Sequence, residues 1–182
     1  MTVLSLADPS VVVLIGAAGS GKSTLAGRLF EPQEVLSSDA FRAVIAGDER
    51  DQRATGAAFR AIERTLEHRL AAGLLTVIDA TDVKPADRRP WLAAAARHGI
   101  PAVAIVFDLP RATVLGQDAG RTRVVGADVI DRHLAALRRS LDQDSLAAEG
   151  FTTVFVLRSP AAAASLAVRR GSAGPPRNRP TR

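Results

Sequence analysis

A glycine-rich octapeptide that directly follows an unbroken aliphatic run constrains the fold of this chain more than any other feature. Residues 16–23 read Gly-Ala-Ala-Gly-Ser-Gly-Lys-Ser and match the pattern G-x-x-x-x-G-K-[ST]. The run of valine, leucine and isoleucine over residues 11–15 is typical of a central strand that is covered on both faces. A helix is expected over residues 22–30. A strand, a glycine-rich turn and a helix in this order predict a P-loop in an α/β fold.

The chemistry expected of this loop is phosphate binding. Its glycines let the backbone bend so that successive N–H groups face one phosphate, and the start of the following helix adds a favourable potential. Lys22 is expected to reach the β- and γ-phosphates of ATP, and the Ser23 hydroxyl is expected to bind Mg²⁺. ATP and Mg²⁺ are therefore the predicted cofactors. The predicted nucleotide-binding residues are Gly16, Ala17, Ala18, Gly19, Ser20, Gly21, Lys22, Ser23 and Thr24.

Strand and helix patterns alternate along the rest of the chain and predict a mainly parallel sheet. Apolar residues recur at three- and four-residue steps from Phe59 to Leu70, which indicates a helix over residues 55–72. Residues 1–168 are predicted to form one P-loop domain, and residues 169–182 a disordered tail rich in Arg, Pro and Gly. The other expected strands cover residues 34–36, 74–78, 102–107 and 152–157, and the other expected helices begin at Asp39, Asp82 (N-cap), Pro110, Asp128 (N-cap) and Ser159.

The net charge of +5 is concentrated in that tail. Of the 24 basic residues, five are arginines within residues 169–182, and the remaining 19 equal the 19 acidic residues. Such a tail either attracts phosphate backbones non-specifically or acts as a solubilising disordered end. The absence of cysteine excludes disulfides and thiolate metal sites and, together with the P-loop, predicts a cytoplasmic location. The apolar runs are too short to cross a bilayer, so no membrane partner is expected.

Asp39 and Arg42 are the first candidates for chemistry beyond nucleotide binding. Asp39 follows the strand expected at residues 34–36, so it lies at the same carboxyl edge of the sheet as the P-loop. A carboxylate there can take the proton of an attacking hydroxyl as general base. Arg42 follows one helical turn later and can hold a phosphate of the acceptor or the transferring group. The alternative is that Asp39 only caps the helix.

Arg121 and Arg123 fall in a loop expected over residues 119–127, between two helices. Small P-loop kinases carry a mobile lid at this place, whose arginines close over the phosphates and bind their oxygens bidentately. The alternative is a solvated loop in an arginine-rich chain. Asp79 either contacts Mg²⁺ through water at the end of its strand or caps the turn at Thr81. No catalytic or binding role is predicted for the remaining candidates. His68, His98 and His133 are interpreted as surface or helix-end residues, and Trp91 as a packing residue.

Several runs taken together resemble a known family. VVVLIGAAGSGKST is followed by EVLSSDAFR, DQRATGAAF, LLTVIDATDV, AVAIVFDLP and GRTR. Over residues 11–157 this set resembles the kinase domain of the bacterial RNA-repair polynucleotide kinase–phosphatase. The resemblance implies phosphorylation of a 5′-OH end of RNA or DNA, with Asp39 as general base, Arg42 at an acceptor phosphate and Arg121 as a lid arginine. It also implies an adenylate-kinase-like three-layer fold with a five-stranded parallel sheet and an arginine-bearing lid.

The sequence departs from this family at two positions. The family's lid has a second arginine four positions before Arg121, where this chain has Gln117, and Arg123 is a candidate substitute. The family's D-A-T-N motif ends here in Asp82. Two other functions stay open: a small-metabolite kinase on the same scaffold, and an ATP-binding module with weak transfer activity.

Overall fold

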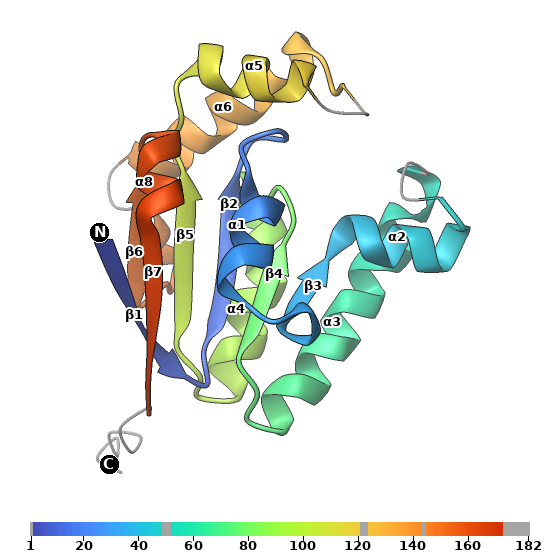
Figure 1. Ribbon diagram of the computed structural model, residues 1–182. Helices are drawn as coiled ribbons and strands as arrows, with labels where there is room; N and C mark the ends of the chain where they lie inside the picture. The colour runs from blue at the N-terminus through green and yellow to red at the C-terminus, as the bar shows by residue number, and fades with distance from the viewer. Residues whose placement is uncertain (1, 49–51, 121–123, 143–144, 173–182) are drawn as a thin grey trace.

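The computed structural model describes residues 2–48, 52–120, 124–142 and 145–172 (Figure 1). Its centre is a sheet of five parallel strands in the order β3-β4-β2-β5-β6, which confirms the predicted fold class. Strand β2 lies in the middle, and every residue of β2 and β5 is buried, as the aliphatic runs predicted. The strands are β2 Val11–Gly16, β3 Val35–Ser37, β4 Thr76–Asp79, β5 Ala102–Phe107 and β6 Thr153–Leu157.

Other elements cover both faces of this sheet and make three layers. Val11, Val13 and Ile15 pack with α3 and α4 on one face, and Val12 and Leu14 pack with α1 on the other. They alternate because successive side chains of a strand point to opposite faces. The helices are α1 Lys22–Leu29, α2 Ser38–Ala46, α3 Thr55–Ala71, α4 Pro85–Arg97, α5 Arg111–Ala119, α6 Ala127–Leu141, α7 Ser145–Glu149 and α8 Pro160–Ser165, with short 3-10 turns at Pro32–Glu34 and Gln52–Ala54. Within the described ranges, no helix is long and apolar enough to cross a membrane.

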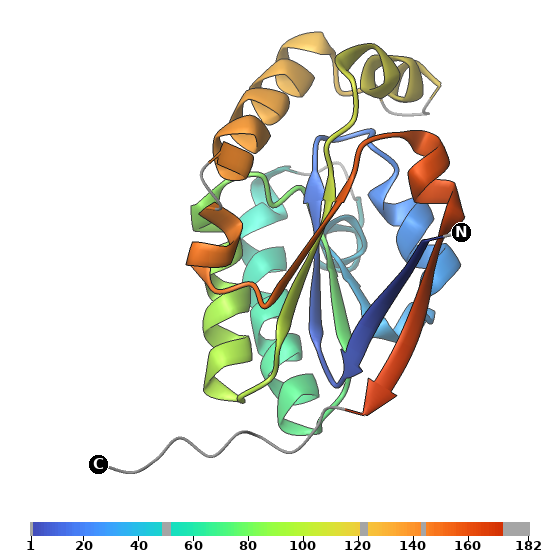
Figure 2. The same ribbon diagram turned by 90° about the vertical axis from the view of Figure 1, so that its left-hand side faces the viewer.

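Two further strands form a separate parallel pair that the sequence patterns did not predict. β1 spans Thr2–Asp8 and β7 spans Leu166–Ser172, with Thr2 opposite Leu166. Figure 2 shows this pair on the α1 side of the sheet, opposite α3 and α4. Leu4, Leu6 and Leu166 are buried there in one cluster with α1. Segments from opposite ends of the described chain therefore close this face of the sheet.

This pair corrects two predictions. The helix expected over residues 159–169 is the short α8 followed by β7, and the strand expected at residues 152–157 is not the last one. The proline and alanines of α8 suit a helix, whereas Leu166 and Val168 turn toward the core from an extended backbone. Residues 169–172 of the expected tail belong to β7, and residues 173–182 lie outside the described residues.

Two predicted helix starts are also wrong. Helix α4 begins at Pro85 with Lys84 as its N-cap, so Asp82 lies before the cap position. Helix α6 begins at Ala127 after Gly126, and Asp128 lies in its first turn. Pro85 fixes the start of α4 because proline is well suited to the first helical turn.

Arg170 of β7 ties the β1–β7 pair to the segment that follows α1. Its guanidinium donates to both carboxylate oxygens of Glu34, at 2.7 Å each, and lies 6.0 Å over the Phe30 ring. The bond from Arg170 is the main reason that the pKa of Glu34 lies below its usual range. From α1 itself, Arg28 donates to the main-chain oxygen of Leu166 at 2.8 Å. The P-loop helix and the terminal strands thus support each other.

Replacing Arg170 by glutamine is therefore expected to lower the stability of the fold. Losing a bidentate pair and a ring contact on a partly exposed surface costs about 1 kcal/mol, or roughly 2–4 °C in melting temperature. Thermal denaturation followed by circular dichroism measures this loss. Arg169→Gln is the matched control, because it removes the same charge from the exposed neighbouring position. Equal losses in the two variants would contradict a specific role for Arg170.

Candidate active site

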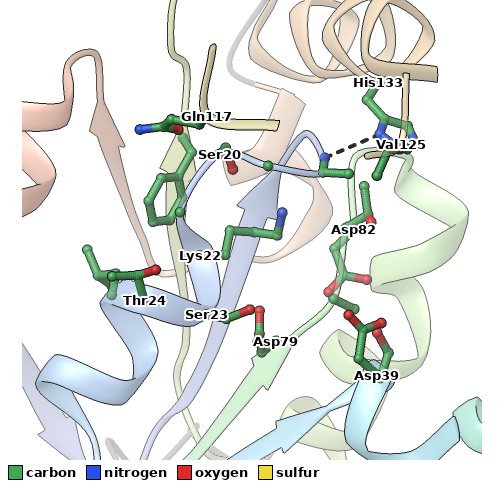
Figure 3. Close-up of a pocket in the computed structure, with 18 of the residues that line it drawn as sticks. Ser20, Lys22, Ser23, Thr24, Asp39, Asp79, Asp82, Gln117, Val125 and His133 are labelled. Atoms are coloured by element: carbon green, nitrogen blue, oxygen red, sulfur yellow. Dashed lines mark hydrogen bonds between the residues drawn. The ribbon is translucent and has the colours of Figure 1, made fainter. Parts of the chain in front are cut away.

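The carboxyl ends of the parallel strands open into one cavity of about 1060 Å³. Its walls come from the P-loop, α2, the β4–α4 loop, α5 and α6, and Figure 3 shows these side chains facing a common space. In open α/β sheets ligands bind at this edge. Of the predicted nucleotide-binding residues, those from Ala18 to Thr24 line the cavity, and Gly16 and Ala17 lie just before them at the end of β2.

The P-loop has the backbone that a phosphate cradle needs. Gly19 and Gly21 adopt φ values of 80° and 90°, in the left-handed region that favours glycine. Lys22 Nζ donates to the main-chain oxygens of Gly16 and Ala17, at 2.9 and 2.7 Å, so its ammonium group lies in the hollow of the loop. The buried Ser20 hydroxyl has no hydrogen-bond partner among the described residues. A loop with an inward cation and an unsatisfied hydroxyl fits a bound phosphate.

Helix α2 brings Asp39 and Arg42 to the opposite wall of the same cavity. The Ser37 hydroxyl caps this helix by accepting from the Ala40 amide at 3.4 Å, so the alternative that Asp39 is the N-cap is wrong. The Asp39 carboxylate is 49% exposed and forms an ion pair with Arg42, whose side chain is buried. An accessible carboxylate beside a fixed guanidinium can accept a proton while the cation holds an anionic group.

Asp79 and Ser23 supply oxygen atoms at the floor of the cavity. Asp79 is the last residue of β4 and is buried, and Figure 3 shows its carboxylate pointing toward the Ser23 hydroxyl. Among the described residues, no group of three or more His, Asp or Glu side chains is arranged to hold a metal ion by itself. Mg²⁺ in phosphoryl-transfer sites uses one or two protein oxygens together with phosphates and water, so this pair fits that ion.

Asp82 is a cavity residue whose burial the sequence did not predict. It is 2% exposed, and its φ of 47° is unusual for a residue other than glycine. One carboxylate oxygen accepts from the Trp91 indole at 3.2 Å, and the other has no partner in the described part of the chain. Arg88, itself fully buried, donates to the Asp82 main-chain oxygen at 2.7 Å. Burial raises the pKa of Asp82 to about 7.

Replacing Asp82 by asparagine is expected to weaken the pH dependence of stability. Between its ordinary pKa of 3.8 and its folded pKa of about 7, Asp82 keeps a proton that the unfolded chain releases. The contribution of Asp82 to the free energy of unfolding therefore falls by about 2 kcal/mol from pH 5 to pH 7.5, and the asparagine variant lacks this contribution.

Urea denaturation at both pH values measures the difference. The amide oxygen of the introduced asparagine can still accept from Trp91, so the substitution preserves the local hydrogen bond. Asp128→Asn, at an exposed position, is the control and is expected to behave like the wild type. An equal pH dependence in Asp82→Asn and wild-type protein would contradict a protonated Asp82.

Described residues on both sides of the α5–α6 connection lie at the cavity. The buried Asp118 carboxylate accepts from the Val125 amide at 2.9 Å and from the Gly126 amide at 3.1 Å, and so fixes the start of α6. Gln117, one residue earlier, lines the cavity. The predicted lid residues Arg121 and Arg123 lie outside the described residues.

His133 of α6 corrects the interpretation of the histidines as surface or helix-end residues. It lies in the middle of its helix, is half-buried, and lines the cavity. Its Nδ1 accepts the amide N–H of Ala18 in the P-loop at 3.4 Å. In the sequence, His133 stands four residues before Leu137 on a helix with an apolar face, which indicates that it lies near the buried side. That position does not reveal its partner Ala18, which is 115 positions away in the chain.

Solved structures share this fold at low sequence identity. A chain of the Pnkp1/Rnl/Hen1 RNA repair complex matches with a TM-score of 0.63 and 20% identity, over 74% of this chain and 46% of that chain. This chain thus spans less than half the length of that relative. A gluconokinase from Sinorhizobium meliloti 1021 matches with a TM-score of 0.58 and 16% identity over 85% of each chain. A sugar kinase from Janibacter sp. HTCC2649 matches with a TM-score of 0.55 and 22% identity, over 82% of this chain and 85% of that chain.

A comparison with curated protein sequences gave no match. A family model described as an AAA domain matches residues 11–143, which is more than two thirds of the chain. This range includes the P-loop, the Asp39–Arg42 pair, the β4–α4 loop and α6. The chain therefore belongs to the AAA domain family and has a P-loop kinase fold.

Proposed function

We propose that this chain is a polynucleotide 5′-hydroxyl kinase that uses ATP and Mg²⁺. The observation that carries the proposal is a single cavity that contains both the P-loop and the Asp39–Arg42 pair. Transfer of a phosphoryl group requires the nucleotide and the acceptor to meet in line within one site. A cradle for phosphates on one wall and an accessible carboxylate on the other meet that requirement.

On the nucleotide side, the P-loop amides would hold the phosphates of ATP. Lys22 would exchange its contacts to the loop oxygens for the β- and γ-phosphates, since its ammonium group already lies in the loop. Ser23 and Asp79 would hold Mg²⁺, Asp79 directly or through water. Bound Mg²⁺ supplies positive charge that offsets the phosphate oxygens.

On the acceptor side, Asp39 would act as general base. It takes the proton of the acceptor hydroxyl while an electron pair of that oxygen forms the new bond to the γ-phosphorus. The bond between the γ-phosphorus and the β–γ bridging oxygen breaks, and its electron pair leaves with ADP. Arg42 would hold the acceptor-side phosphate, because its guanidinium is fixed beside Asp39.

Arg121 and Arg123 would complete the site as lid arginines. Their support is their position between α5 and α6, because Gln117 and Val125, on either side of them in the chain, line the cavity. In this proposal the kinase domain, predicted over residues 1–168, extends through β7 to residue 172, and the basic tail is reduced to residues 173–182. The chain would act in the cytoplasm.

Two observations favour a 5′-OH polynucleotide end as the acceptor. The motifs SSDAFR, TGAAF and DAT accompany the P-loop in this chain. The fold also resembles a chain of an RNA repair complex. RNA and DNA ends are both proposed substrates.

A small metabolite is the second candidate acceptor. The gluconokinase likeness extends over 85% of both chains. Among the described residues, the cavity lining holds Asp39, Asp79, Asp82 and Asp87 beside Lys22, Arg28 and Arg42. A lining with no excess of basic side chains favours a hydroxyl-rich acceptor over one that carries many phosphates. In a third possibility, an ATP-binding module, nucleotide binds and no acceptor is phosphorylated.

Measuring ADP release over a panel of acceptors tests the proposal. The panel contains 5′-OH RNA, 5′-OH DNA, the same oligonucleotides with a 5′-phosphate, and sugar acids. The proposal predicts release that depends on a 5′-OH oligonucleotide and disappears with the 5′-phosphate. Release that depends on a sugar acid would establish the metabolite kinase instead, and nucleotide binding without release would establish the binding module.

A further inference from the structure

His133 connects α6 to the P-loop across the mouth of the cavity. Its Nδ1 lies 3.4 Å from the Ala18 amide nitrogen and accepts that N–H, as the dashed line in Figure 3 shows. An Nδ1 that accepts requires the neutral imidazole with its proton on Nε2. The contact joins α6 directly to the P-loop.

The Ala18 amide belongs to the loop that the proposed function assigns to phosphate. One N–H makes one good hydrogen bond, so a phosphate oxygen that binds this amide must take the place of His133 Nδ1. We propose that His133 is a nucleotide-exchanged contact: it holds the Ala18 amide in the free protein and yields it to a phosphate of the bound nucleotide, to which the protonated imidazole then donates. This inference rests on the proposed function, because it requires nucleotide in the P-loop.

The charges around His133 explain why its protonation would change with nucleotide. Lys22 faces it from the P-loop, Lys84 and Asp87 from the start of α4, and Arg132 from its own helix. Burial, followed by the charge of Lys22, lowers the pKa of His133. In the free protein, three cations and one anion surround His133. A bound triphosphate adds several negative charges nearby, and these charges favour the imidazolium form of His133.

The exchange also changes how α6 is held. Asp118 fixes the start of α6 through the Val125 and Gly126 amides, and His133 fixes the middle of the same helix to the P-loop. Breaking the second contact leaves α6 held at its start by Asp118.

Isothermal titration of the whole chain tests this inference. The imido analogue of ATP with Mg²⁺ is titrated at pH 7.5 in buffers of different ionisation enthalpy, so that the slope of heat against that enthalpy gives the protons taken up. His133→Asn is the key variant, because its amide oxygen can accept from Ala18 but takes no proton. His68→Asn, at an exposed position on α3, is the matched control.

The inference predicts that wild type and His68→Asn take up roughly half a proton more per nucleotide than His133→Asn. In ¹⁵N spectra of the ring, His133 is expected to change from the Nε2–H tautomer to the imidazolium on binding. Binding with the same proton uptake in all three proteins, or with His133 neutral throughout, would overturn the inference and leave the proposed function standing. No binding heat in any of the proteins would overturn the proposed nucleotide site, and this inference with it.

Discussion

Phosphate transfer by Lys22→Ala is expected to fall at least roughly a thousandfold below the wild type. The reason is that the Lys22 ammonium lies within the P-loop, 2.9 and 2.7 Å from two loop oxygens, where the β- and γ-phosphates of ATP would bind. It would neutralise charge that grows on those oxygens during transfer. Initial rates at saturating acceptor measure the effect.

Lys84→Ala is the matched control for this variant. Lys22 and Lys84 are the two lysines of the chain, and Lys84 is exposed at the start of α4 and does not line the cavity. It is expected to keep activity within a few-fold of the wild type. A Lys22→Ala protein that is folded and retains a tenth of the wild-type rate would contradict the assignment of the phosphate site.

Asp39→Asn is expected to lower kcat by roughly 10²- to 10⁴-fold and to leave nucleotide affinity nearly unchanged. Asparagine has the shape of aspartate and cannot take the acceptor proton, whereas the P-loop does not depend on it. Asp39 is also half-exposed, and Ser37 caps α2, so the helix keeps its cap in the variant. Steady-state kinetics and titration with the imido analogue of ATP separate the two effects.

An acidic residue away from the cavity controls for the loss of negative charge. Asp128→Asn changes an exposed carboxylate in the first turn of α6 and is expected to retain wild-type kcat. If Asp39→Asn loses nucleotide affinity but keeps kcat, Asp39 belongs to the binding site of the nucleotide and is not the base.

Local sequence patterns predicted the parts of the fold that depend on neighbouring residues. The run over residues 11–15 could be covered on both faces only in a central strand, and it is β2. Asp39 was placed at the cavity because it follows the short strand β3, and parallel strands end at the same edge. The cap on Ser37 was missed because two serines precede Asp39, and their spacing does not say which one lies outside the helix.

The remaining features depend on contacts between distant residues. The burial of Asp82 depends on Trp91 of the next helix and on the start of that helix after Lys84. The residues next to Asp82 in the sequence predict neither feature. The contact between His133 and Ala18 joins two elements that are 115 positions apart in the chain. The β1–β7 pair brings Thr2 beside Leu166, and no turn signal between them can predict such a pairing.

The reaction proposed for the cavity is transfer of the γ-phosphate of ATP to a 5′-OH end. The most direct measurement uses γ-labelled ATP, Mg²⁺ and a 5′-OH oligonucleotide, followed by digestion to nucleotides to locate the label. Label is expected on the 5′-terminal nucleotide with wild type and Lys84→Ala, and none above background is expected with Lys22→Ala or Asp39→Asn. If wild-type protein binds ATP but leaves both the RNA and the DNA oligonucleotide unlabelled, the proposed 5′-kinase activity is contradicted.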